Sequence, residues 1–278
     1  MTAGDAGDSE TQDFRSLRDF GSRRASQTLV LILTATLALS GCWTLRPRNP
    51  TTISAAPATG VVFVADGAGN FQVASRTLRD LIERERLPIH VVAFEWSHGY
   101  GRILADQLGY RYALAQGKRL AVEIEAYARD HPHMPIYLVG HSAGSTVILS
   151  ALEHAPPGLV ERAFLLSPSV SNQYDIRPAV NAVNRGMHVY YSRHDYWYLG
   201  LATHVLGTSD RRFIHPASGR VGFKVHTDHG DFALQAKLFQ RPWQHIDAQT
   251  GNFGGHYGNY APSFLKRHLL PLLEPVKS

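Results

Sequence analysis

The residues with the clearest capacity for chemistry lie in one short stretch, Gly140-His141-Ser142-Ala143-Gly144. An apolar, β-rich run over 136–139 precedes it, and an apolar run of helix-forming character follows. A serine at such a sharp strand-to-helix turn presents its hydroxyl above the end of a sheet. The two glycines let strand and helix pass closely, and the free N–H groups at the start of the helix stabilise negative charge. We therefore predict that Ser142 is a nucleophile for acyl transfer.

This Gly-x-Ser-x-Gly turn, between a buried strand and a helix, resembles the nucleophile elbow of the α/β-hydrolase superfamily. The resemblance implies an α/β-hydrolase fold, with a mostly parallel central sheet, helices on both faces and a minimal cap. It also implies a serine, an acid and a histidine in that chain order. Such a site needs no metal and no organic cofactor.

Asp195 is the candidate for the acid. It closely follows a predicted strand at 188–192, and the superfamily places its acid just after such a strand. The alternative is that Asp195 caps a helix over 196–206, since aspartate is a preferred N-cap residue.

The candidate for the histidine is His256, which lies in Gly254-Gly255-His256-Tyr257-Gly258 ahead of a predicted helix over 263–270. The glycines allow a bent loop to reach the serine, and a Gly-flanked histidine before the last helix resembles the superfamily's histidine loop. His226 and His229 follow a predicted last strand over 220–225, which is also a usual place for this histidine. We favour His256, with His229 as the alternative.

A glycine-containing loop follows the first predicted strand, at 66–70. By resemblance to the oxyanion loops of lipases, the N–H of Ala68 is one expected oxyanion donor, with Gly67 close behind, and the N–H of Ala143 is the other. Phosphate binding is disfavoured because no Lys-Ser or Lys-Thr pair follows the loop. His226 and His229 flank Asp228, but nothing completes a metal coordination set, so no metal is expected.

The pattern of apolar runs predicts the elements that must position these side chains. β-branched apolar runs predict buried parallel strands, and apolar residues at helical spacing predict amphipathic helices. The connection over 167–185 is too short for a large cap domain. The predicted strands are 61–65, 89–94, 163–166, 188–192 and 220–225, and the predicted helices are 73–87, 104–129 with a break near Gly117, and 263–270.

The first 60 residues have the character of an export segment and a linker. Two arginines precede an apolar run over 29–39 that is too short for a comfortable membrane span, and the run ends at Leu39-Ser40-Gly41-Cys42. That ending resembles the bacterial lipobox, which implies lipidation of Cys42, the chain's single cysteine. We expect a signal peptide at 1–41, a tether at 42–60 and a hydrolase domain at 61–278. The protein would then be a membrane-anchored lipoprotein of the cell envelope, facing the periplasm or the exterior.

The composition suits a globular domain, with 44% hydrophobic and 18% charged residues. The formal charge of +5 is modest, and no basic block with interleaved aromatics supports nucleic-acid binding. The expected function is a serine hydrolase of ester bonds, with lipid or other acyl substrates included. Aromatic residues at 196–199 and 253–257 would suit an apolar acyl or aryl group, although they would equally suit a core. The alternative function is a non-catalytic envelope lipoprotein that uses the fold as a binding scaffold.

Overall fold

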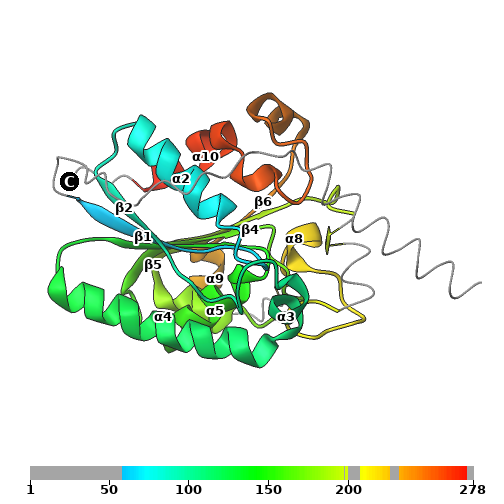
Figure 1. Cartoon of the computed structure of the whole chain (residues 1–278), viewed down its shortest axis with the longest axis horizontal. Helices are drawn as coiled ribbons and strands as arrows, with labels where there is room; N and C mark the ends of the chain where they lie inside the picture. Colours follow the sequence, from blue (N-terminus) through cyan, green and yellow to red (C-terminus); the bar gives the residue numbers. More distant parts are fainter. Residues whose placement is uncertain (1–57, 197, 200–206, 226–231, 274–278) are drawn as a thin grey trace, which may run out of the picture. The chain divides into compact units, whose positions relative to one another are not determined.

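A computed structural model describes residues 58–196, 198–199, 207–225 and 232–273 (Figure 1). All of these belong to one compact unit, 54–278. The predicted signal peptide (1–41), Cys42 and nearly all of the predicted tether (42–60) lie outside the described residues, as does His229.

The centre of this unit is a six-stranded sheet in the order β2-β1-β3-β4-β5-β6, with every neighbouring pair parallel. Parallel strands buried on both faces are typically runs of apolar residues, and β1, β3 and β4 have this character. The strands are β1 (Gly60–Ala65), β2 (Ile89–Ala93), β3 (Ile136–His141), β4 (Val160–Leu166), β5 (Val183–Tyr191) and β6 (Leu238–Pro242).

Helices cover both faces of the sheet, and the strand residues alternate between the two resulting cores. Phe63 of β1 faces a core that includes Val147 and Ile148 of α5, whereas Val62 faces a core that includes Leu78 of α2 and Phe264 of α10. Figure 1 shows α2 and α10 on one side of the sheet and α4 and α5 on the other. The predicted α/β architecture, with helices on both faces of a parallel sheet, is confirmed.

The α-helices of the described part are α2 (Val73–Arg84), α3 (Ile103–Leu108), α4 (Tyr110–Asp130), α5 (Gly144–His154), α6 (Arg177–Ala182), α8 (Ser218–Val221), α9 (Phe232–Lys237) and α10 (Pro262–His268). Short 3-10 turns occur at η2 (His245–Thr250), η3 (Gly258–Tyr260) and η4 (Leu270–Leu272). The connection from β4 to β5 holds only α6, so no cap domain is inserted there, as predicted. Within the described ranges, no helix combines the length and apolar character needed to cross a bilayer.

The predicted strand over 220–225 is wrong, because the last strand is β6. Residues 218–221 form α8, and Gly222 then takes a left-handed conformation (φ 79°). The side-chain amide of Gln240 in β6 bonds both the N–H and the C=O of Phe223, at 2.6 and 3.0 Å. The apolar segment therefore packs beside the sheet edge through a side chain and does not join the backbone ladder.

The predicted helix over 104–129 breaks at Gly109 and not near Gly117. Gly117 lies inside α4, where a Cβ would stand 2.4 Å from the Cβ of Ser150 in α5. Its glycine is thus required by close helix packing. The predicted break near Gly117 is wrong because glycine weakens a helix without necessarily ending it.

Candidate active site

Ser142 lies at the turn between β3 and α5, with a strained backbone. Its φ is 51°, a left-handed value that is uncommon outside glycine. A Cβ at Gly140 would lie 2.8 Å from the Cα of Ser145, and one at Gly144 would lie 2.1 Å from the carbonyl oxygen of Ala65. Only glycine fits at either position, so the Gly-x-Ser-x-Gly pattern is a steric requirement of this turn.

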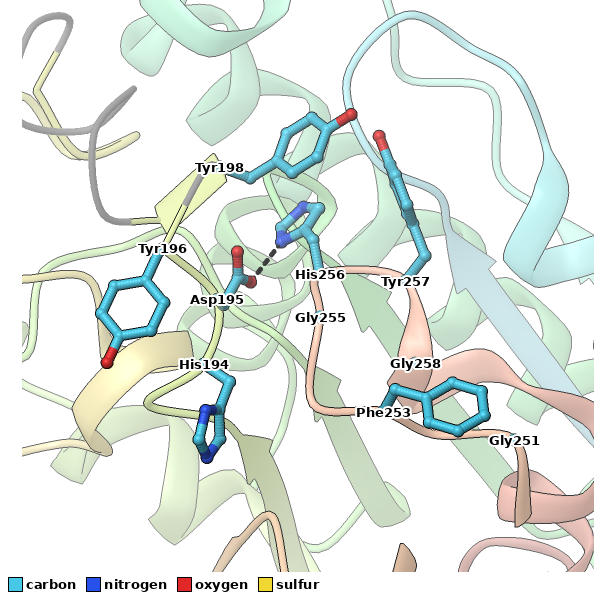
Figure 2. A pocket seen from close by; sticks show the side chains of 10 residues that line it. All are labelled: His194, Asp195, Tyr196, Tyr198, Gly251, Phe253, Gly255, His256, Tyr257 and Gly258. Atoms are coloured by element: carbon cyan, nitrogen blue, oxygen red, sulfur yellow. Dashed lines mark hydrogen bonds and ion pairs between the residues drawn. The ribbon is translucent and has the colours of Figure 1, made fainter. Parts of the chain in front are cut away.

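Ser142, His256 and Asp195 form a continuous chain of hydrogen bonds at the carboxyl edge of the sheet. The Ser142 Oγ is 2.9 Å from His256 Nε2, and His256 Nδ1 is 2.6 Å from Asp195 Oδ2 (the second contact is dashed in Figure 2). Because a carboxylate accepts only, Nδ1 carries the proton and Nε2 is free to accept from the serine hydroxyl. All three residues are buried, with relative exposures of 9% or less.

The two oxygens of the Asp195 carboxylate have different partners. While Oδ2 faces His256, Oδ1 accepts a hydrogen bond of 3.3 Å from the N–H of Leu199. Most of the helix predicted over 196–206 lies outside the described residues. The second bond orients the carboxylate toward the histidine.

A pair of buried asparagines closes the loop that carries His256. Asn252 Nδ2 donates to Asn259 Oδ1 at 2.9 Å, and Asn252 Oδ1 accepts from the N–H of Gly254 at 2.9 Å. Asn259 in turn donates to the Ser167 hydroxyl at the end of β4, at 2.9 Å. The loop is therefore tied to itself and to the sheet. We did not predict these residues, although two asparagines bracketing a glycine-rich segment were a readable signal.

His141, the residue before the serine, supports the same loop from beneath. Its Nε2 lies 3.3 Å from the carbonyl oxygen of His256, a contact in which the ring must donate. Burial, and then the neighbouring His256, lower the pKa of His141 to about 3. A Cβ at Gly67 would come within 2.9 Å of the His141 Nδ1. His141 is thus a neutral ring packed between the glycine loop and the histidine loop.

The loop over 66–70 lies against the serine, as expected of an oxyanion loop. A Cβ at Gly67 would be 3.4 Å from the Ser142 Cβ. Among the described residues, the N–H groups of Ala68 and Ala143 have no hydrogen-bond acceptor, and Ala143 occupies the N-terminal end of α5. Two unpaired donors are therefore present on the two segments that the prediction named.

Asp106 in α3 fixes this loop from the other side, and the sequence reasoning missed it. Its carboxylate accepts from the N–H of Gly69 at 2.7 Å and from the N–H of His98 at 2.8 Å. It also contacts the ring Nδ1 of His98 at 2.9 Å and the hydroxyl of Ser97 at 2.5 Å. Its side chain is fully buried, so these contacts satisfy a carboxylate that water does not reach.

Asp66, the first residue after β1, has a structural role. Its Oδ1 accepts from the N–H groups of Ala74 and Ser75 at 2.8 and 3.2 Å, in the first turn of α2. Burial raises its pKa, while these bonds act in the opposite direction. The carboxylate thus joins the end of β1 to the start of α2.

A cavity of about 370 Å³ opens beside His256. It lies between residues 194–196 and 198 on one side and the 251–258 loop on the other (Figure 2), and Ser142 is not among its lining residues. The lining residues are His194, Asp195, Tyr196, Tyr198, Gly251, Phe253, Gly255, His256, Tyr257 and Gly258. In the described part of the chain, no cluster of three or more His, Cys, Asp or Glu could hold a metal ion.

The strand order, the strained elbow and the chain order of Ser142, Asp195 and His256 together define the α/β-hydrolase fold. No family model and no curated protein sequence matches the chain.

Several solved structures are similar to the structure of this chain, at low sequence identity. The poly(3-hydroxybutyrate) depolymerase LpqC of Bordetella parapertussis is 14% identical, with a TM-score of 0.47 over 77% of this chain and 80% of that one. The catalytic core of an acetyl xylan esterase of Trichoderma reesei is 13% identical, with a TM-score of 0.41 over 77% and 100%. The esterase Pf2001 of Pyrococcus furiosus is 10% identical, with a TM-score of 0.37 over 76% and 83%.

Proposed function

We propose that this protein is a serine hydrolase that cleaves ester bonds through an acyl-enzyme. The observation that carries the proposal is the unbroken hydrogen-bond chain from the Ser142 hydroxyl through His256 to Asp195. A nucleophile, a base and a group that orients the base are the three parts that acyl transfer to serine requires.

In the first step, the Ser142 Oγ attacks the acyl carbon while His256 Nε2 takes its proton. The Asp195 carboxylate holds the Nδ1 proton of His256 at 2.6 Å and stabilises the imidazolium that forms. The Nε2 proton then passes to the oxygen of the leaving alcohol as the C–O bond breaks. A water molecule repeats the sequence on the acyl-enzyme, releasing the acid and restoring Ser142.

The charge that develops on the acyl oxygen needs donors that are already in place. The unpaired N–H groups of Ala68 and Ala143 fit this role, and Gly67, which has no side chain, lets the 66–70 loop approach Ser142 closely. Each such donor typically contributes about 3 kcal/mol to lowering the barrier.

Labelling with a fluorophosphonate probe tests the proposal. The wild-type chain should be labelled, Ser142→Ala should not be, and His256→Ala should be labelled far more slowly. Ser145→Ala is the matched control, because Ser145 lies near Ser142, at the start of α5, but its buried hydroxyl bonds the carbonyl of Gly140 at 3.2 Å. This variant should label as the wild type does.

Two outcomes would overturn parts of the proposal. Undiminished labelling of Ser142→Ala would refute Ser142 as the nucleophile. Loss of labelling in His229→Ala but not in His256→Ala would assign the base to His229 in place of His256. Absence of labelling together with no turnover of short-chain esters would favour the scaffold role.

We also propose that the domain is anchored in the cell envelope through lipidated Cys42. The support is the sequence alone, which places one cysteine directly after an apolar export segment. Mass spectrometry of the membrane-extracted protein should find a diacylglyceryl thioether at Cys42. An unmodified N-terminus, or a Cys42→Ala variant that fractionates like the wild type, would contradict it.

A further inference from the structure

The cavity beside His256 lies on one particular side of the reacting centre. His256 and Asp195 line it and Ser142 does not. In acyl transfer to serine, the histidine must hand its proton to the leaving oxygen, so the leaving alcohol lies next to the histidine. A group bound in this cavity is therefore on the alcohol side of the ester and not on the acyl side.

The lining is largely aromatic. Among the described residues, neither lysine nor arginine lines the cavity, and the carboxylate that does, Asp195, is 2% exposed and already bonded to His256. Tyr196, Phe253 and Tyr257 are exposed at 55%, 76% and 43%. Such a surface offers ring faces and edges to a neutral ligand.

The exposed rings are held on an ordered frame. Phe253 has no ring partner among the described residues, yet its neighbour Asn252 is hydrogen-bonded through both its amide nitrogen and its amide oxygen and is 1% exposed. A Cβ at Gly255 would meet nothing within 4 Å, so the loop backbone borders open space. Tyr196 lies on the opposite side of the cavity from Phe253 (Figure 2). The Arg220 guanidinium is 5.2 Å from the centre of the Tyr196 ring. A loop that is ordered before binding loses little entropy when a ligand arrives.

We propose that this cavity binds the leaving alcohol of the substrate and that this alcohol carries a neutral aromatic ring. The inference rests on the proposed ester hydrolase function and deepens it. A volume of about 370 Å³ accommodates such a group. Because the lining rings are exposed, the cavity selects through ring contacts and not through enclosure, which favours an aromatic group over an alkyl chain.

The test compares acetate esters that differ only in the alcohol, using the full-length protein. Benzyl acetate and cyclohexylmethyl acetate have similar bulk and leaving alcohols of similar acidity, so their kcat/KM ratio isolates the ring preference. We expect the wild type to prefer the benzyl ester about three- to tenfold. Phe253→Leu and Tyr196→Leu, which keep apolar bulk without a ring, should each move the ratio toward one.

Phe213→Leu is the control. Phe213 is also exposed, at 51%, but does not line the cavity, so its variant should keep the wild-type ratio. Because the substituted rings are exposed, the variants should keep the fold, which circular dichroism verifies. A wild-type ratio of one, or a ratio unchanged in both Phe253→Leu and Tyr196→Leu, would overturn the inference.

The two levels of proposal fail differently. If both esters are cleaved in a Ser142-dependent manner but at equal rates, only the proposal that the cavity binds an aromatic alcohol is refuted. If neither ester is cleaved and Ser142 does not react with the probe, the hydrolase function falls and the alcohol site falls with it.

Discussion

The substitution His141→Gln should remove a defined part of the acid sensitivity of this domain. In the folded chain, burial and the proximity of His256 lower the pKa of His141 to about 3, and the ordinary value is 6.5. Between these values the unfolded chain binds a proton at this position and the folded chain does not. Stability from this residue is therefore complete above pH 6.5 and is lost as the pH falls toward 3.

The magnitude follows from the same values. At pH 5.0, which is 1.5 pH units below the unfolded value, the loss is about 2 kcal/mol, since each unit corresponds to about 1.4 kcal/mol. Burial also lowers the pKa of His188, to about 4, and that of His268, so these residues contribute in the same direction. They are present in both proteins and cancel in the comparison. Glutamine does not titrate, and its amide can still donate toward the carbonyl of His256.

Urea unfolding, followed by tryptophan fluorescence at pH 7.5 and 5.0, measures the effect. Between the two pH values the wild type should lose about 2 kcal/mol more of its unfolding free energy than His141→Gln does. A general destabilisation by the substitution cancels, because the measured quantity is a difference of differences.

His90→Gln is the matched control for this experiment. His90 lies on β2 but is exposed, so solvent reaches its ring in the folded and the unfolded chain alike. This variant should respond to pH as the wild type does. Equal losses in the wild type and in His141→Gln would refute the assignment of His141 as a buried neutral histidine.

Two further predictions concern the polar residues that hold the loops of the site. Asn252→Ala removes the bonds to Asn259 and Gly254, leaves buried partners unsatisfied, and should cost about 2–4 kcal/mol in urea unfolding; an unchanged midpoint would contradict this. Asp106→Asn keeps the shape but removes the charge that accepts from the N–H of Gly69, and should lower kcat on a short-chain ester more than it raises KM; an effect on KM alone would indicate a role in binding only.

Much of the fold could be predicted because local pattern and long-range packing agree in it. The runs at 61–65 and 136–139 are buried on both sides, so composition alone reveals them. Ser142 could be identified as a candidate from the sequence for a similar reason, because the steric demands of its turn admit only glycine at 140 and 144. The parallel strands then bring Asp195 and His256 to the same edge of the sheet.

The features that the sequence predicted wrongly or missed share a physical origin, because they depend on contacts between segments far apart in the chain. Gly117 marks a helix crossing with Ser150, which no local window contains. The segment at 220–225 has strand composition, but Gln240 takes the place of a strand neighbour for Phe223. Asp106 resembles an ordinary helix carboxylate until the fold brings Gly69 and His98 to it.

The glycines and asparagines of the histidine loop act together to position His256. The glycines of 254–258 let the chain bend toward Ser142, but fixing each residue's backbone costs about 1–2 kcal/mol, and most for glycine. A loop left to itself would hold His256 in many positions and seldom at 2.9 Å from the serine. The buried Asn252–Asn259 pair offsets that entropy from within the loop, and the His141 ring bonds its centre at the His256 carbonyl. These buried contacts therefore keep the base in place, while the exposed ring of Phe253, on the same ordered loop, is left free to meet a ligand.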